Sequence, residues 1–228
     1  MGIPENRPGP GKFAADFLRK IQALWCSVYV LCVLRGEKVI YGASMKPVDK
    51  ALYNELLIGC GREWSKRLCQ GDDREWKNLH TLDINSDHNP DTVWDLTDFP
   101  LPFDDDSFDE IHAYEVLEHT GNQGDYKFFF AQFSEFWRIL KPGGVFAGTA
   151  PHHTSVWAFG DPSHTRTIQK EQFTFLDQTE YTNQVGKTSM SDFRYLYKAD
   201  FSIVYLNEGK EALQFVLKAV KPSRIMKG

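Results

Sequence analysis

Apolar positions recur along the chain in two alternating patterns from residue 52 onward. Short apolar runs predict strands, and stretches with apolar residues every three or four positions predict helices. The expected strands cover residues 55–58, 78–83, 92–94, 110–114 and 145–150, and the expected helices cover residues 62–68 and 125–140. This alternation predicts an α/β fold with a doubly wound, mostly parallel sheet of the Rossmann-like kind.

The helix expected over residues 125–140 has a strongly apolar face. It is expected to end before Pro142, Gly143 and Gly144, because proline and glycine do not continue a helix. The inner face comprises Phe129, Phe130, Phe133, Phe136, Trp137 and Leu140. At the end of the chain, residues 201–206 and 212–220 are expected to form two strands around a turn at 207–210. The sequence therefore predicts a C-terminal antiparallel hairpin that adds to the sheet.

The N-terminal part differs in pattern from the rest. Residues 1–11 are rich in proline and glycine, and apolar residues from Phe13 to Leu31 then recur at helical spacing. We expect residues 1–44 to be an extension with an amphipathic helix and residues 45–228 to be the main domain, with a lid or insert at about 151–197. The helix face would dock on the domain, pair with a second copy in a homo-oligomer, or rest on a membrane surface. The apolar stretch at 21–34 is shorter than the ~20 residues of a membrane span, so no span is predicted.

Composition narrows the function classes. The formal net charge of −5 and the pI of about 5.8 do not favour long nucleic acid as a partner, although a local basic face would still permit it. The four cysteines form no CxxC pair, which is typical of a reduced, cytoplasmic protein.

Glycine and acidic residues follow the expected strands. Gly59 and Gly61 flank Cys60 where the first strand ends, and glycine there lets backbone N–H groups approach a ligand. Asp83 ends the second strand, where a carboxylate can accept both hydroxyls of a ribose. The alternative is a solvated aspartate at a strand end.

Residues 95–119 carry the most specific motifs. They include Asp95, Leu-Pro-Phe at 101–103, Ser-Phe-Asp at 107–109 and Val-Leu-Glu-His at 116–119. With the glycine loop, this order and spacing resembles the class I S-adenosylmethionine-dependent methyltransferases, and the resemblance extends over about residues 52–220, including Gly-Asp-Pro-Ser-His-Thr-Arg at 160–166. It implies S-adenosylmethionine as cofactor. The residues it places at the cofactor are Gly59, Cys60, Gly61, Asp83, Ile84, Asp95, Leu96 and Glu115; Asp95 would accept the adenine amine, Leu96 would offer its backbone N–H, and Glu115 would line the sulfonium side.

The glycine motif departs from the family at two positions. Leu57 stands where the family has an acid, and Glu63 stands where it has a third glycine. The missing acid usually helps to hold the amino group of the cofactor, so its methionine end would be held differently here. A non-catalytic binding or assembly protein on the same fold is therefore a competing hypothesis.

Histidines supply the candidate catalytic groups. Methyl transfer from a sulfonium mainly needs alignment and exclusion of water, and a base only where the acceptor loses a proton. The candidates are His119, His152 and His164, with Asp161 as an orienter, because imidazole can accept a proton at neutral pH. The histidine spacing matches no zinc pattern and has no cysteine partner, so no metal site is predicted.

The class of methyl acceptor is predicted from the aromatic residues near the site and from the charge of the chain. Aromatic residues in the lid and the acidic pI favour a small or lipid-like molecule; the aromatics are Trp157, Phe159, Phe173, Phe175, Tyr181, Phe193, Tyr195 and Tyr197. The motifs of the amino-methylating and cytosine-C5 DNA enzymes are missing from the sequence. Methylation of nucleic acid or protein is the alternative, and it would need a basic or open groove beside the site. The available basic residues are scattered along the chain, namely Lys66, Arg67, Lys187, Arg194, Lys198 and Lys221.

Overall fold

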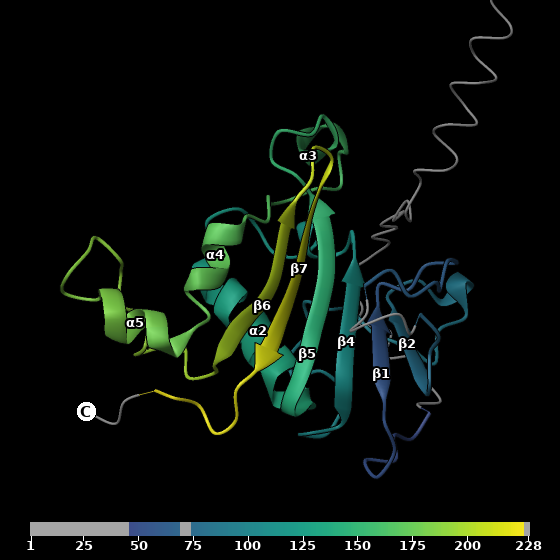
Figure 1. The fold of residues 1–228 in the computed structure, drawn as a ribbon. Coiled ribbons are helices and arrows are strands. Elements are labelled where there is room, and N and C mark those ends of the chain that lie inside the picture. The colour runs from purple at the N-terminus through teal and green to yellow at the C-terminus, as the bar shows by residue number, and fades with distance from the viewer. Residues whose placement is uncertain (1–45, 69–73, 226–228) are drawn as a thin grey trace, which may run out of the picture. The chain divides into compact units, whose positions relative to one another are not determined.

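The computed structural model describes residues 46–68 and 74–225. The predicted N-terminal helix and the extension at 1–44 lie outside these residues. The strands are β1 (Glu55–Ile58), β2 (Leu79–Asp83), β3 (Thr92–Val93), β4 (Phe108–Tyr114), β5 (Leu140–Pro151), β6 (Phe201–Glu208) and β7 (Ala212–Ala219). They form one seven-stranded sheet in the order β3-β2-β1-β4-β5-β7-β6 (Figure 1).

The sheet is parallel from β3 to β5 and antiparallel at its end. Residue Ile58 of β1 pairs with Leu82 of β2 on one side and with Ala113 of β4 on the other. Strand β7 enters antiparallel beside β5, and β6 pairs antiparallel with β7 at the edge. The predicted fold and its C-terminal hairpin are therefore confirmed. Chain order reverses between β1 and β4, and ligands in open α/β sheets bind at such a switch point.

The helices are α2 (Tyr126–Ile139), α3 (Trp157–Gly160), α4 (Lys170–Thr174) and α5 (Gln178–Gln184), with single 3₁₀ turns η1 (Ser86–His88) and η2 (Leu117–His119). Helix α2 begins where the sequence predicts it, because the Asp125 side chain accepts a hydrogen bond from the N–H of Phe128 and caps the first turn. Within the described part of the chain, no helix combines the length and the apolar character that a membrane crossing requires.

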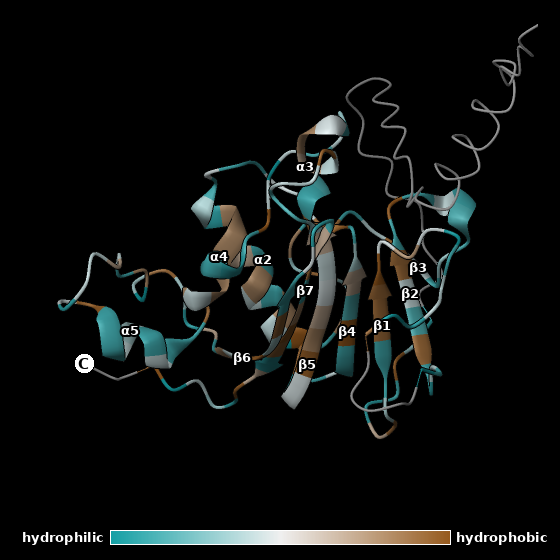
Figure 2. Ribbon diagram, turned by 45° about the horizontal axis from the view of Figure 1, so that its top comes forward, coloured by the Kyte–Doolittle hydropathy of each residue, from teal (hydrophilic) through white to brown (hydrophobic). Residues whose placement is uncertain are grey.

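One face of the sheet carries the main core. Phe133 and Phe136 of α2 and Phe146 of β5 are fully buried, and the rings of Phe136 and Phe146 stack with centroids 4.6 Å apart. Phe173 of α4 and Phe215 of β7 extend the same core. Figure 2 shows the matching brown, apolar segments in the central strands. Three of the predicted lid aromatics belong to this core and not to a pocket wall, namely Phe173, Tyr181 and Tyr197.

Residues 62–68, next to the other face of the sheet, have no regular secondary structure. The helix predicted over this range is therefore wrong. The backbone N–H groups of Arg67 and Leu68 donate to the hydroxyl of Tyr114, at 3.0 and 3.1 Å, and so are not used in a helical ladder. Lys66 is drawn onto the sheet, where its Nζ lies 2.5 Å from Glu55 Oε1 and 2.8 Å from Glu110 Oε2. The segment predicted as a helix therefore has an irregular course, and its Lys66 joins a buried ionic network on the sheet.

Glu110 makes the stability of the fold depend on pH. Burial alone would raise the pKa of Glu110, but hydrogen bonds from His112, Lys66 and Tyr53 outweigh it and lower the pKa from 4.5 to about 2. A lowered folded-state pKa stabilises the fold above pH 4.5 and loses that effect as the pH falls toward 2. At 1.36 kcal/mol per unit, we expect about 3 kcal/mol of unfolding free energy to be lost over this window.

The check is urea unfolding at about pH 7 and about pH 2, which spans the window over which Glu110 becomes protonated. Glu110→Gln should flatten this dependence, whereas Asp104→Asn should leave it unchanged because the Asp104 side chain is 87% exposed. An equally steep dependence in Glu110→Gln would contradict this assignment.

Candidate active site

The predicted cofactor residues lie after β1, β2, β3 and β4, at the carboxyl ends of the parallel strands (Figure 1). Gly59 and Gly61 both have left-handed backbone, with φ of 57° and 55°. A side chain would be strained at either position, which explains the glycine pair. Cys60 between them is buried; burial, with the nearby Asp83 charge, raises the pKa of its thiol to about 12, so it is no nucleophile at neutral pH.

Asp83 fixes the glycine loop. Its side chain is fully buried, and its Oδ2 accepts a hydrogen bond of 2.8 Å from the N–H of Gly61. Its Oδ1 accepts another of 2.8 Å from the N–H of Asn85, and His88 Nδ1 lies 3.2 Å from Oδ2. The carboxylate therefore joins the end of β2 to the turn after β1. The predicted contact between Asp83 and a ribose remains a prediction.

The region predicted to hold adenine is more open. Asp95 is partly buried, and its Oδ1 accepts 2.8 Å hydrogen bonds from both the N–H and the hydroxyl of Thr97. Leu96 beside it is 7% exposed, whereas Ile84 after β2 is 39% exposed. This arrangement gives an acid and an apolar side chain next to each other after β3, and an accessible apolar side chain after β2.

The departures in the glycine motif have structural counterparts. Leu57 is buried in a small cluster with Cys60 and Tyr114, and Glu63 is exposed. Glu55, the nearest acid in this motif, is committed to Lys66 and to the N–H of Lys77, which lies 2.5 Å from its Oε2. The contacts of Glu55 with Lys66 and Lys77 therefore occupy the carboxylate nearest to the missing acid of the family motif.

A compact acidic and histidine cluster follows β4. One carboxylate oxygen of Glu118 and one ring nitrogen each of His119 and His164 all lie within 4.8 Å of one another. Glu115 precedes them with φ of 57°, a left-handed conformation that is uncommon outside glycine and concentrated at functional sites. Burial raises the pKa of Glu115, and burial together with the Glu115 charge raises that of Glu118 further.

The loop at residues 161–167 brings His164 to this cluster. The N–H of Thr165 donates to the carbonyl of Glu118 at 2.9 Å, and the N–H of Gln123 donates to the carbonyl of Thr165 at 3.1 Å. The buried Arg166 then donates from Nε to the carbonyl of Leu117 at 2.8 Å. Sequence analysis did not single out Arg166 because an arginine in a loop is usually solvated.

Three of the four catalytic candidates lie together. The rings of His119 and His164 meet edge to face with centroids 4.6 Å apart, and Asp161 Oδ2 lies 3.9 Å from His164 Nε2. Burial and the neighbouring His164 lower the pKa of His119, so its ring is neutral near pH 7. His152 has other neighbours: its Nδ1 lies 2.7 Å from Thr154 Oγ1, and its Nε2 lies 3.8 Å from Glu208.

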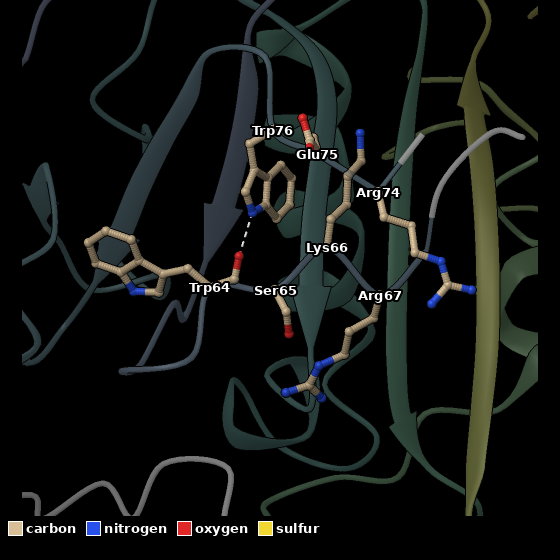
Figure 3. A pocket seen from close by; sticks show the side chains of 7 residues that line it. All are labelled: Trp64, Ser65, Lys66, Arg67, Arg74, Glu75 and Trp76. Atoms are coloured by element: carbon tan, nitrogen blue, oxygen red, sulfur yellow. Dashed lines mark hydrogen bonds between the residues drawn. The ribbon is translucent and has the colours of Figure 1, made fainter. Parts of the chain in front are cut away.

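The hollows of the described surface include one after β1 and one at the start of α2. The larger, of about 710 Å³, is bordered by residues 64–67 and 74–76, with Trp76 donating to the carbonyl of Trp64 (Figure 3). The smaller, of about 210 Å³, lies between the start of α2 and the lid, with Arg166 on its wall. Its aromatic walls are Tyr126, Phe129, Phe130, Phe175 and Phe193.

Residues 56–148, from β1 into β5, match the family described as "Methyltransferase domain". A relative from Mycolicibacterium smegmatis named "Probable S-adenosylmethionine-dependent methyltransferase" is 36% identical over 89 residues. Residues 56–148 belong to the class I S-adenosylmethionine-dependent methyltransferases. The recognition made from the sequence motifs is confirmed, and the cofactor of this family is S-adenosylmethionine.

The matches to known proteins cover different shares of the chains. The alignment with the M. smegmatis relative covers 37% of this chain and 31% of that protein. Among solved structures, an S-adenosylmethionine-dependent methyltransferase from Archaeoglobus fulgidus is 18% identical, covering 74% of this chain and 87% of the other, at a TM-score of 0.48. The N-methyltransferase NodS from Bradyrhizobium japonicum, bound to S-adenosylhomocysteine, is 16% identical, covering 73% and 78%, at a TM-score of 0.44.

Proposed function

We propose that this chain transfers a methyl group from S-adenosylmethionine to a small or lipid-like acceptor. The observation that carries the proposal is the order of groups along the carboxyl edge of the methyltransferase domain. The glycine loop and Asp83 follow β1 and β2, Asp95 follows β3, and the histidine cluster follows β4. This order supports a proposal in which one end of the site holds the cofactor and the other end, at His119 and His164, receives the acceptor.

The surface beside the histidine cluster supports an apolar acceptor. Val156, Trp157 and Phe159 lie just before Asp161 and His164, and they are 77%, 46% and 78% exposed. Exposed apolar side chains gathered in one segment commonly mark a binding surface. The aromatic hollow of about 210 Å³ by Arg166 is consistent with a small apolar group.

The basic residues that would form a nucleic-acid groove are largely engaged elsewhere. Lys66 is buried between two glutamates, Arg194 pairs with Asp192 at 2.7 Å, and Lys221 pairs with Asp106 at 2.5 Å. Neutralised cations contribute little to phosphate binding. Nucleic acid and protein acceptors, and a non-catalytic role suggested by Leu57 and Glu63, are the alternatives that the experiment must separate.

The experiment supplies S-adenosylmethionine with a radioactive methyl group to the purified chain and three acceptor mixtures from bacterial cells. These are an organic-solvent extract with small molecules, total RNA, and total protein. We expect label to enter the first mixture alone. Label in RNA or protein would refute the proposed acceptor class, and no label in any mixture despite cofactor binding would favour the non-catalytic alternative.

The exposed side chains of α3 are expected to contribute to binding of the acceptor. Phe159→Ala should raise the KM for an apolar acceptor by about tenfold, because about 1–2 kcal/mol of burial is lost, while cofactor affinity stays unchanged. Tyr205→Ala is the matched control, since this 43% exposed aromatic lies on the edge strand β6. Equal kinetics for Phe159→Ala and Tyr205→Ala would remove α3 from the acceptor site.

A further inference from the structure

The cluster after β4 contains a buried carboxylate that the described residues leave without a hydrogen-bond donor. Glu118 is 1% exposed, and neither of its carboxylate oxygens accepts a hydrogen bond within the described part of the protein. Burying a carboxylate without partners costs several kcal/mol, as a rough estimate, so such groups are paired, protonated or bound to a cation. Glu118 therefore needs either a bound cation or a proton.

The second observation lies on the opposite side of the cluster. The Nδ1 of His164 is also buried and has no hydrogen-bond partner among the described residues. Ligand atoms of Glu118, His119 and His164 come within 4.8 Å of one another. Two ligands on one Zn²⁺ at about 2.1 Å each lie at most about 4.2 Å apart, so shifts below about 1 Å would complete the coordination.

We propose that Glu118, His119 and His164 bind a divalent transition-metal cation beside the acceptor end of the methyltransferase domain. Two imidazoles and one carboxylate are donors that suit Zn²⁺, Fe²⁺, Co²⁺ and Mn²⁺. Three protein ligands leave at least one coordination position for water or an oxygen of a ligand.

Hydrogen bonds from neighbouring residues hold His119 and the loop of His164 in place. The Ser163 hydroxyl lies 3.1 Å from His119 Nδ1 and 2.6 Å from Asp161 Oδ1, which links the ring to a carboxylate through a hydroxyl. Arg166 donates to Gln132 Oε1 at 2.5 Å and to Thr120 Oγ1 at 3.0 Å, fixing the loop that carries His164. Such outer contacts orient metal-binding histidines and contribute to metal affinity.

His119 and His164 were already candidate residues from the sequence, but their spacing along the chain predicted no metal site. The histidine-rich segment at 152–164 suggests a site within one loop, but the structure separates His152 from the cluster and brings His164 to Glu118 and His119 instead. The competing explanation is a proton shared between Glu115 and Glu118, which would satisfy both carboxylates without a cation.

The test is titration of the full, tag-free chain with Co²⁺, followed by visible absorption and calorimetry. We expect one cobalt per chain with d–d bands of nitrogen and oxygen ligation, and a higher unfolding temperature of the wild-type protein in cobalt. Glu118→Gln and His164→Ala should each lower the cobalt affinity by at least about tenfold. His153→Ala should leave it unchanged, because His153 is an exposed histidine of the same segment.

Three results would overturn the proposal. The first is no stoichiometric binding by the wild-type chain, as expected for a shared proton. The second is equal affinity in wild type, Glu118→Gln and His164→Ala. The third is thiolate-to-cobalt charge-transfer absorption, which would assign the metal to cysteine. Circular dichroism of each variant checks folding, and the wild-type titration decides the question even if one variant does not fold.

Discussion

Replacing Asp83 by alanine is expected to weaken binding of S-adenosylhomocysteine by about tenfold to a hundredfold. Asp83 accepts hydrogen bonds from the N–H groups of Gly61 and Asn85, both at 2.8 Å, and it is fully buried. Its loss leaves both donors unsatisfied and releases the glycine loop, at about 1–3 kcal/mol for each group. Each 1.4 kcal/mol expressed in binding is about a tenfold change in Kd.

Two readouts separate the ways in which Asp83 acts. Calorimetry reports affinity, and thermal unfolding without ligand reports stability. A loss in both would show that Asp83 holds the loop, whereas weaker binding at unchanged stability would show direct contact with the ribose. Asp87→Ala is the control, since Asp87 is an exposed acid in the neighbouring turn η1. Unchanged affinity in Asp83→Ala would exclude this residue from the cofactor site.

Replacing Lys66 by alanine is expected to cost about 3–5 kcal/mol of unfolding free energy. The Lys66 side chain is 3% exposed and lies between Glu55 and Glu110, whose side chains are 0% and 7% exposed. Removing it leaves two buried carboxylates without their cation. Because domains are stable by only about 5–15 kcal/mol, this single change removes a large share of the total.

Guanidinium unfolding of Lys66→Ala beside wild type measures this effect. Lys50→Ala is the matched control and should change stability by no more than about 0.5 kcal/mol, because Lys50 is exposed. A loss below about 1 kcal/mol in Lys66→Ala would mean that the network is solvated or rearranges, and that irregular chain covers this face for another reason.

The strands could be predicted because their apolar residues follow a simple pattern. Strand β1 occupies the predicted range, and α2 begins at Tyr126, one residue after the predicted start of the helix at Asp125. The hairpin of β6 and β7 is also present. The helix expected at 62–68 does not form, because polar side chains of β1 and β4 bind its residues. Lys66 forms ion pairs with Glu55 and Glu110, and the backbone N–H groups of residues 67 and 68 donate to the Tyr114 hydroxyl.

The site was predictable where it follows a motif and unpredictable where it depends on tertiary pairing. The glycine loop and Asp83 meet as their positions after adjacent strands suggest. Glu118 and Arg166 are polar residues in loops, so sequence alone favours solvated positions. They become buried because residues 163–167 lie along residues 118–123, and no local pattern in the sequence encodes that pairing.

Calorimetric titration of the wild-type chain with S-adenosylhomocysteine tests the central claim most directly. The claim is that the glycine loop, Asp83 and Asp95 form a working cofactor site although Leu57 replaces the usual acid. We predict one ligand bound per chain with a Kd at micromolar level or tighter. The absence of binding by folded protein would contradict the account and favour a non-catalytic role for this fold.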